Sequence, residues 1–255
     1  MNKQFAIFID IDGTLYSDLG IPQENIDVIR EVREAKHYVF VNTGRSYAHI
    51  PDVVFDTVPL DGAVSALGAY ARFRDDVLHN SHFSRDQLRV VSEHFLSEGR
   101  TCFIEGDEKV FVIHRKHNHH KDMIPINSSD DFDKLYQDSN VHIFLTRGMM
   151  TDKERELFQD DFLYIEHENY FECALKGNSK SRGMEIIANH LGLPLENCIA
   201  MGDSLNDMDM MKHAGISIAM DNALDEVKEI SDFVTKSVDE AGVAHALRKY
   251  VLNKL

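Results

Sequence analysis

Two aspartates, Asp10 and Asp12, follow an apolar run at residues 5–9, and Gly13 and Thr14 come directly after them. A short apolar run bounded by turn-forming residues is typical of a strand that is buried on both faces. We expect Asp12 to lie in the turn after this strand, because Gly13 permits a sharp change of chain direction. Carboxylates in such a position can bind a metal ion, act as nucleophiles or transfer protons.

Reactive side chains also follow two other apolar segments. They are Thr43, Gly44 and Arg45 after the segment 38–41, and Asp203, Asn206 and Asp207 after the segment 198–201. Lys180 stands at the start of a predicted helix and could face the same place. The carboxyl ends of parallel strands meet at one edge of an open sheet, which is where such folds bind their ligands.

These residue types, brought to one edge, suit phosphoryl chemistry with a divalent cation. Asp10 and Asp203, together with a backbone carbonyl, form a hard oxygen site of the kind that Mg²⁺ accepts. One aspartate could attack phosphorus and form an aspartyl phosphate, while a second donates a proton to the leaving oxygen. Suitable donors for the phosphate oxygens are the Lys180 ammonium, the Thr43 hydroxyl and the N–H groups around Gly13 and Gly44.

The segments that must position these residues alternate between strand and helix. The strand at 5–9 is followed by a helical pattern over 23–36 and by a second buried strand at 38–41. This βαβ order predicts a parallel sheet. Further strands are predicted at 62–65, 198–201, 216–219 and 233–234, and further helices at 180–191 and 206–212.

Residues 83–170 have a different pattern, in which a hairpin over 101–115 and a strand at 141–146 are flanked by helices at 85–97 and 151–158. The 137 residues from Thr43 to Lys180 are far too many for a simple crossover. We therefore predict an α/β protein in which a core domain is interrupted by an inserted α+β domain. The core domain would comprise residues 1–82 and 175–255, and the inserted domain residues 83–174.

The composition narrows the choice of partners. The 255 residues include 43 Asp and Glu against 27 Lys and Arg, which gives a formal net charge of −16. Such a charge repels nucleic acid and anionic membranes, so a small molecule or a metal ion is the expected partner. The sequence has no signal-like segment, no membrane-spanning run and no cysteine spacing typical of zinc or disulfides, which predicts a cytoplasmic protein.

His114, His117, His119 and His120 form a further cluster of potential metal ligands. A solvated loop after the predicted hairpin is favoured over a metal site, because partner ligands do not recur at regular spacing.

Four motifs occur in order along the chain: DIDGTL at 10–15, NTGR at 42–45, NSKSRGM at 178–184 and GDSLND at 202–207. Together they resemble the haloacid dehalogenase (HAD) superfamily, in particular its Cof-type phosphatases of subfamily IIB, which carry a large C2 cap between the second and third motifs. The segment 219–247 is also similar to the C-terminal run of that family, whereas the cap is weakly matched. Two positions depart from the pattern of many members, which have asparagine at Leu67 and glycine at Asp221.

The resemblance implies a Rossmann-like HAD core with an α+β cap, and a Mg²⁺-dependent phosphatase. Asp10 would be the nucleophile and Asp12 the general acid and base. The implied metal site comprises Asp10, the Asp12 main-chain carbonyl and Asp203, with Asp207 supporting the metal or Lys180. The residues implied to contact the phosphoryl group or substrate are Thr43, Lys180, Asn206, Gly13, Thr14, Gly44 and Arg45. Arg45 could equally pair with an acidic neighbour.

The expected reaction is hydrolysis of phosphomonoesters of small metabolites, with sugar phosphates expected first and FMN or pyridoxal phosphate as alternatives. Two other functions stay open: a phosphomutase that uses the same aspartyl phosphate, and a non-enzymatic phospho-aspartate receiver or phosphate sensor. The phosphate motifs do not separate hydrolase from mutase, whereas receivers are much shorter and lack the DxDGT motif. A monomer or a weak homodimer is expected.

Overall fold

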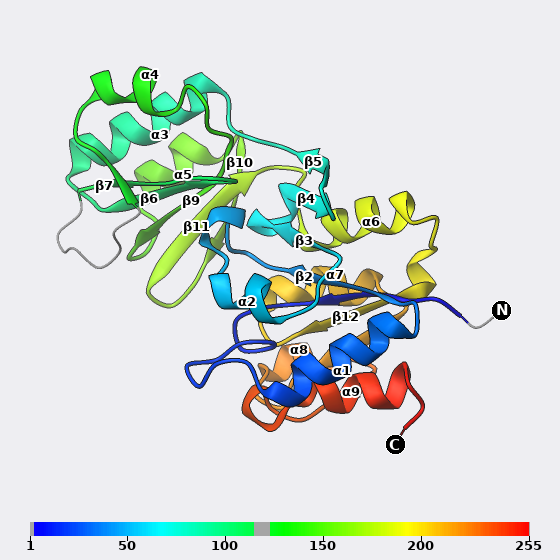
Figure 1. Ribbon diagram of the computed structural model, residues 1–255. Helices are drawn as coiled ribbons and strands as arrows, with labels where there is room; N and C mark the ends of the chain where they lie inside the picture. Colours follow the sequence, from blue (N-terminus) through cyan, green and yellow to red (C-terminus); the bar gives the residue numbers. More distant parts are fainter. Residues whose placement is uncertain (1–2, 115–122, 255) are drawn as a thin grey trace. The chain divides into compact units, whose positions relative to one another are not determined.

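The computed structural model describes residues 3–114 and 123–254 and has an α/β fold (Figure 1). Contacts divide the chain into two compact units. The first unit runs to Gly44, includes Pro51–His79 and resumes at Ser179, and the second comprises Arg45–Ile50 and Asn80–Asn178. The predicted domain boundaries lie a few residues from these passages. The histidine run at 117–120 lies outside the described residues.

The first unit is built on an eight-stranded sheet in the order β14-β13-β12-β1-β2-β3-β4-β5. Neighbouring strands from β14 to β3 are parallel, and β4 runs antiparallel to β3. The central strands β1 and β12 are buried at every residue, which accounts for their continuous apolar sequence. The strands are β1 (Ala6–Ile9), β2 (Tyr38–Asn42), β3 (Gly62–Ser65), β4 (Tyr70–Phe73), β5 (Asp76–Asn80), β12 (Cys198–Gly202), β13 (Ile216–Ala219) and β14 (Phe233–Val234).

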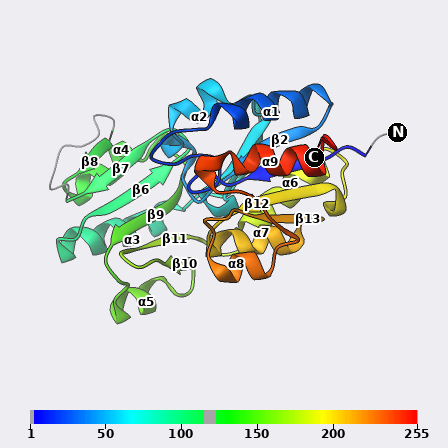
Figure 2. The same cartoon turned by 90° about the horizontal axis from the view of Figure 1, so that it is seen from below.

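Helices cover both faces of this sheet. One face carries α1 (Gln23–Glu34) packed against α9 (Gly242–Tyr250), and the other carries α6 (Lys180–His190) packed against α7 (Met208–His213) (Figures 1 and 2). In α1 the buried residues Ile26, Ile29 and Val32 recur every three positions and form the apolar stripe that faces the core. Two short helices, α2 (Asp52–Thr57) and α8 (Asp225–Glu229), complete this unit.

The helix predicted at 206–212 is not continuous. A 3-10 turn, Leu205–Asp207, comes first, and α7 follows it. The Ser204 hydroxyl and the Asp207 carboxylate form a capping box at this turn, so local side-chain hydrogen bonds tighten the chain before the α-helix begins.

The second unit contains a six-stranded sheet in the order β10-β11-β9-β6-β7-β8. Its neighbouring strands are antiparallel except for the parallel pair β7 and β8, and the predicted hairpin over 101–115 corresponds to β6 and β7. The strands are β6 (Cys102–Gly106), β7 (Val110–Ile113), β8 (Met123–Ile126), β9 (Val141–Arg147), β10 (Phe162–Glu166) and β11 (Tyr170–Leu175), and the helices are α3 (Arg85–Glu98), α4 (Phe132–Leu135) and α5 (Asp152–Phe158).

An aromatic cluster forms the core of the second unit. Phe144 and Phe162 from the sheet meet Phe158 from α5 in edge-to-face pairs with ring centroids 5.1 to 5.8 Å apart. This is the arrangement that the charge distribution of aromatic rings favours. Within the described residues of both units, no helix is long and apolar enough to cross a bilayer.

The first turn of α6 is held against the ends of β2 and β3. The Ser179 hydroxyl caps the helix by accepting a hydrogen bond from the Arg182 N–H (3.1 Å), and the Asn42 side chain donates to the Lys180 carbonyl (2.9 Å). Gly68, which has φ +86°, approaches so closely that a Cβ there would lie 1.9 Å from the Ser179 carbonyl oxygen. These contacts fix the position of Lys180.

Gly68→Ala is therefore expected to destabilise the protein more than Gly192→Ala. Both glycines have positive φ, at +86° and +66°, but nothing lies within 4 Å of a Cβ at Gly192. The free energy of unfolding should fall by about 2–5 kcal/mol for Gly68→Ala, where strain and overpacking add, and by about 1–2 kcal/mol for Gly192→Ala, where strain acts alone. Urea unfolding followed by circular dichroism measures both values. Equal losses would contradict the close approach.

Candidate active site

A buried ion pair network joins the ends of β1 and β12 to the start of α6. The Lys180 ammonium donates to Asp10 Oδ1 at 2.7 Å and to Asp207 Oδ1 at 2.6 Å, and the side chains of Lys180 and Asp207 are completely buried. Asp10 is 5% exposed. Because isolated charges are costly to bury, the three side chains depend on one another.

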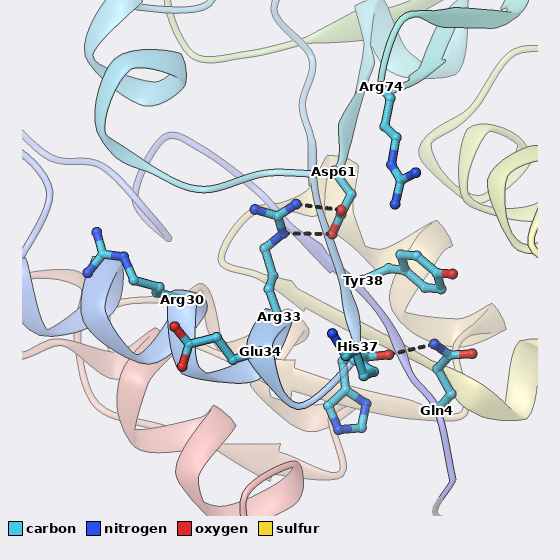
Figure 3. A pocket seen from close by; sticks show the side chains of 9 residues that line it. Gln4, Arg30, Arg33, Glu34, His37, Tyr38, Asp61 and Arg74 are labelled. Atoms are coloured by element: carbon cyan, nitrogen blue, oxygen red, sulfur yellow. Dashed lines mark hydrogen bonds and ion pairs between the residues drawn. The ribbon is translucent and has the colours of Figure 1, made fainter.

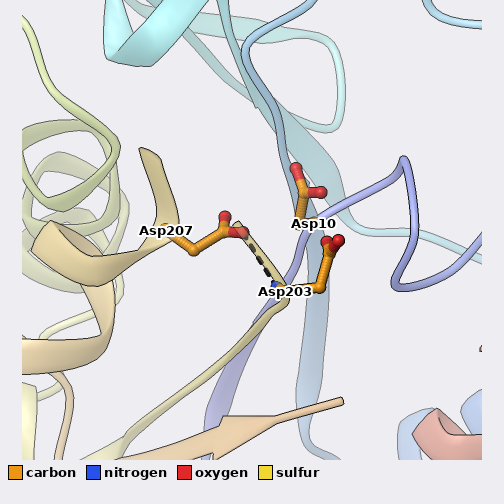
Figure 4. Close-up of side chains that lie close together, drawn as sticks. All are labelled: Asp10, Asp203 and Asp207. Carbon is orange, nitrogen blue, oxygen red and sulfur yellow. Dashed lines mark hydrogen bonds between the residues drawn. The ribbon is translucent and has the colours of Figure 1, made fainter. Parts of the chain in front are cut away.

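Asp203 adds a third carboxylate to this network. Carboxylate oxygens of Asp10, Asp203 and Asp207 lie within 4.8 Å of one another (Figure 4). One ammonium therefore faces three carboxylates, and the cluster is short of positive charge. This is the arrangement in which a protein accepts a divalent cation with oxygen ligands.

The hydrogen bonds separate the roles of the three carboxylates. Both oxygens of Asp207 are occupied, since Oδ1 binds Lys180 and Oδ2 accepts from the N–H groups of Asp203 and Ser204 at 3.0 Å each. Asp203 Oδ1 accepts from the Thr14 hydroxyl at 3.0 Å. Among the described residues, no donor reaches Asp10 Oδ2 or Asp203 Oδ2. The oxygens available to a ligand are therefore those of Asp10 and Asp203.

Burial and mutual repulsion alter the ionisation of the cluster. Burial raises the pKa of Asp10 well above its usual range, and repulsion by the Asp207 carboxylate adds to this rise. The Lys180 ammonium opposes the rise without cancelling it. Burial, and then Asp207, raises the pKa of Asp203 to about 6. Burial alone would lower the pKa of Lys180, but the attraction of Asp10 and Asp207 outweighs it and keeps the lysine protonated.

The turn after β1 brings its backbone against Asp203. Gly13 has φ +79°, and a Cβ there would lie 2.4 Å from Asp203 Oδ2. The Asn222 side chain donates to the Gly13 carbonyl at 2.8 Å and steadies the turn. Asp12 lies in this turn, as expected, and is exposed to solvent, and its carboxylate adds to the repulsion that acts on Asp203.

The other predicted residues divide between the two units. Thr43, 1% exposed, follows β2, and its N–H donates to the Val64 carbonyl at 3.0 Å. Gly44 is the last residue of this stretch of the first unit, whereas Arg45 belongs to the second unit, where it donates to the His49 carbonyl at 3.2 Å. Asn206 lies in the turn after β12 and accepts from the Ser204 hydroxyl at 2.9 Å.

Sequence reasoning overlooked three residues that support this site: Asn42, Ser204 and Asn222. Asn42 holds the start of α6, Ser204 donates to Asp207, and Asn222 holds the Gly13 turn. Asn42 and Ser204 lie inside two of the four motifs, so their positions in the sequence already indicated that they belong to the site. Asn222 follows β13 at the same sheet edge, which is the only sequence feature that could have drawn attention to it.

The chain belongs to the haloacid dehalogenase-like hydrolases, because the model of that family matches residues 7–247. It is a phosphatase of the Cof type. It is 29% identical over 256 residues to a protein of Bacillus subtilis (strain 168) named "Putative phosphatase YkrA", and the match covers 97% of this chain and 98% of YkrA. It is also 29% identical over 261 residues to 5-amino-6-(5-phospho-D-ribitylamino)uracil phosphatase YcsE of the same organism, covering 96% and 95% of the two chains. A hypothetical protein from Geobacillus kaustophilus HTA426 has a similar structure, with a TM-score of 0.84, 26% identity, and coverage of 99% of this chain and 100% of that one.

The raised pKa of Asp203 predicts a pH-dependent loss of stability in the metal-free protein. The pKa is about 6 in the folded state, against about 3.9 in an unfolded chain. Between these values the folded state binds the proton better, so this stabilisation is complete below pH 4 and is lost as the pH rises through 6. The variant Asp203→Asn has no ionisable group at this position, so its stability lacks this pH-dependent contribution. With chelator present, the melting temperature of Asp203→Asn minus that of the native protein should increase from pH 4 to pH 6.5, and a constant difference would contradict the shift.

Proposed function

We propose that this protein is a Mg²⁺-dependent phosphatase that hydrolyses phosphomonoesters of small metabolites through an aspartyl phosphate on Asp10. The observation that carries the proposal is the incomplete charge balance of the buried cluster, with the available oxygens of Asp10 and Asp203 beside Lys180. Asp10 and Asp203 would hold the metal together with the Asp12 main-chain carbonyl. Asp207 would act through Lys180 and the backbone of Asp203, rather than as a direct ligand.

The donor set fits Mg²⁺ because it consists of hard carboxylate oxygens, which leave room for water and a phosphate oxygen. When bound, the metal would neutralise charge on the phosphoryl group and on Asp10. In the proposed reaction the Asp10 carboxylate attacks phosphorus, and the bond from phosphorus to the leaving oxygen breaks. Asp12 donates a proton to that oxygen, and then accepts one from the water that hydrolyses the aspartyl phosphate.

Positively charged and polar groups of the chain would hold the phosphoryl oxygens. Lys180 is protonated and fixed by two ion pairs, and Thr43 directly follows the neighbouring strand β2. The exposed position of Asp12 suits a group that must meet both the leaving oxygen and water. Thr14 is engaged with Asp203, so its role would be to orient that ligand, with the phosphate bound by N–H groups of the Gly13 and Gly44 turns.

The proposed substrate is a small phosphorylated metabolite, with a sugar phosphate as the first candidate and FMN or pyridoxal phosphate as alternatives. Two relatives, YcsE and YitU, are named as phosphatases of 5-amino-6-(5-phospho-D-ribitylamino)uracil, so a phosphorylated sugar alcohol joined to a ring is also a candidate. We assign substrate selection to the second unit as the cap domain. The net charge of −16 supports the absence of nucleic acid and anionic membrane partners. We further propose a cytoplasmic monomer or weak homodimer.

Phosphate release from a panel of phosphorylated sugars, FMN, pyridoxal phosphate and the ribitylaminouracil phosphate should require Mg²⁺ and should stop when a chelator is added. Asp10→Asn should reduce release below detection, because the amide cannot act as the nucleophile. Asp18→Asn is the matched control, since it makes the same change of charge at an exposed position of the same loop. Release by Asp10→Asn at the native rate would disprove the assigned nucleophile.

Asp12→Asn should slow turnover by about 10²–10⁴-fold with alkyl phosphates, because the leaving alkoxide and the attacking water both lose their proton-transfer partner. With 4-nitrophenyl phosphate, whose leaving group needs no proton, the first step should survive and the aspartyl phosphate should accumulate. Mass spectrometry of the rapidly quenched variant would detect the added phosphoryl group. Unchanged turnover, or slow turnover of both substrates without a phosphorylated protein, would contradict the role of Asp12.

A further inference from the structure

A polar cavity lies in the first unit at the opposite edge of the sheet from Asp10. Its volume is about 410 Å³, and it is lined by residues at the amino ends of the central strands (Figure 3). Gln4 precedes β1, Tyr38 begins β2 and Asp61 precedes β3. The candidate active site is at the carboxyl ends of the same strands, so the two sites are separate.

The lining of this cavity is basic, although the chain as a whole carries a formal charge of −16. Four permanently charged cations line it against two carboxylates, Glu34 and Asp61. The cations are Arg30, Arg33, Lys36 and Arg74. A local excess of positive charge in an acidic protein attracts anions that the rest of the surface repels.

Ion pairs within the chain neutralise part of this positive charge. Arg33 binds Asp61 through two hydrogen bonds, of 2.7 and 3.0 Å, and the Asp61 carboxylate also accepts from the Val39 N–H at 3.0 Å. Arg30 pairs with Asp27 at 3.3 Å, and both side chains are more than half exposed. Asp61 is therefore satisfied and buried, and it has little capacity left to neutralise other cations.

Lys36 and Arg74 are the cations left available. Within the described residues, neither has a carboxylate at ion-pair distance, and the Arg74 guanidinium lies over the Phe73 ring at 4.8 Å. In Figure 3 the Arg74 side chain extends from the turn between β4 and β5 towards Tyr38. A guanidinium placed in this way can bind a phosphoryl group through two N–H groups, with a lysine as a second positive charge.

Both cations stand at turn positions where the backbone favours glycine or asparagine. Lys36 has φ +72° and Arg74 has φ +53°, which is the left-handed region that favours glycine and asparagine. Lys36 stands at the position after α1 where helices commonly end in glycine, because its N–H and that of His37 bond back to Arg33 and Val32. Arg74 stands in the two-residue turn between β4 and β5, where glycine or asparagine is also preferred. Each position therefore carries a cationic side chain in a backbone conformation that glycine would adopt at lower cost.

We propose that this cavity is a second binding site, specific for a phosphate-bearing small anion and separate from the proposed active site. Arg74 and Lys36 bind the phosphoryl oxygens, and Arg33, held by Asp61, adds positive charge behind them. The cavity has the volume of a small-metabolite site. The anion is either free inorganic phosphate or a phosphate ester, which share this chemistry.

Equilibrium dialysis with radiolabelled inorganic phosphate, in the presence of Mg²⁺ and low salt, tests the proposal. The double variant Lys36→Gly with Arg74→Gly should bind one phosphate fewer per chain than the native protein, or bind it at least about tenfold more weakly, since it lacks two charge-assisted contacts. Lys212→Ala, which removes an exposed lysine from α7 of the same unit, should bind as the native protein does. The difference between proteins is the readout, so the result does not depend on whether the active site binds phosphate.

The substitutions are chosen so that folding is preserved. Glycine relieves the positive φ at both positions, so the melting temperature of the double variant should be equal to or above that of the native protein. A second pair, Lys36→Asn with Arg74→Asn, repeats the test with side chains that tolerate the same backbone. A phosphonate analogue of a sugar phosphate, which cannot be hydrolysed, distinguishes the two ligands. Tighter binding of the analogue than of inorganic phosphate indicates an ester, and weaker binding indicates free phosphate. Equal numbers and affinities of phosphate sites in the native protein and both double variants would overturn the proposal.

Discussion

The burial of Lys180 between two carboxylates is the interaction on which the rest of the site depends. An ammonium group at this depth is tolerated because Asp10 and Asp207 both bind it directly, and their carboxylates are tolerated because it is there. The three groups come from the end of β1, the start of α6 and the turn after β12, so the parallel order of these elements is needed before the charges can meet. Asp203 gives the cluster an excess of negative charge, and this excess favours the binding of a cation.

Much of the surrounding structure serves to keep these groups in place. The first turn of α6 is capped by its own serine, bonded by Asn42 and packed against Gly68 without room for a side chain. Asp207 orders the chain after β12 through main-chain hydrogen bonds, and the Gly13 turn packs directly on Asp203. Preorganisation of this kind lowers the reorganisation that charge stabilisation would otherwise require during the reaction.

The sequence predicted the parts of the fold that depend on local pattern. Three strands, β3, β13 and β14, have the expected bounds, and α6 ends one residue before the prediction, since apolar runs and helix stop signals are local. The hairpin of β4 and β5 was missed because its turn contains Arg74 in place of the usual glycine or asparagine. The different bonding of Asp203 and Asp207 could not be read from motif spacing, because it depends on main-chain N–H groups oriented by the fold. The assignment of Arg45 to the second unit and the basic cavity likewise depend on contacts between distant segments.

A titration of thermal stability with Mg²⁺, in the absence of substrate, shows directly whether the carboxylate cluster binds a divalent cation. A cation that binds the folded cluster must raise the melting temperature in proportion to the logarithm of its concentration above the dissociation constant. This rise is expected for the native protein and for Asp225→Asn, an exposed acid at the start of α8 in the same unit, and it should be lost in Asp203→Asn. A melting temperature that is unchanged by Mg²⁺ in the native protein, or raised equally in Asp203→Asn, would contradict the claim that these carboxylates form a divalent cation site.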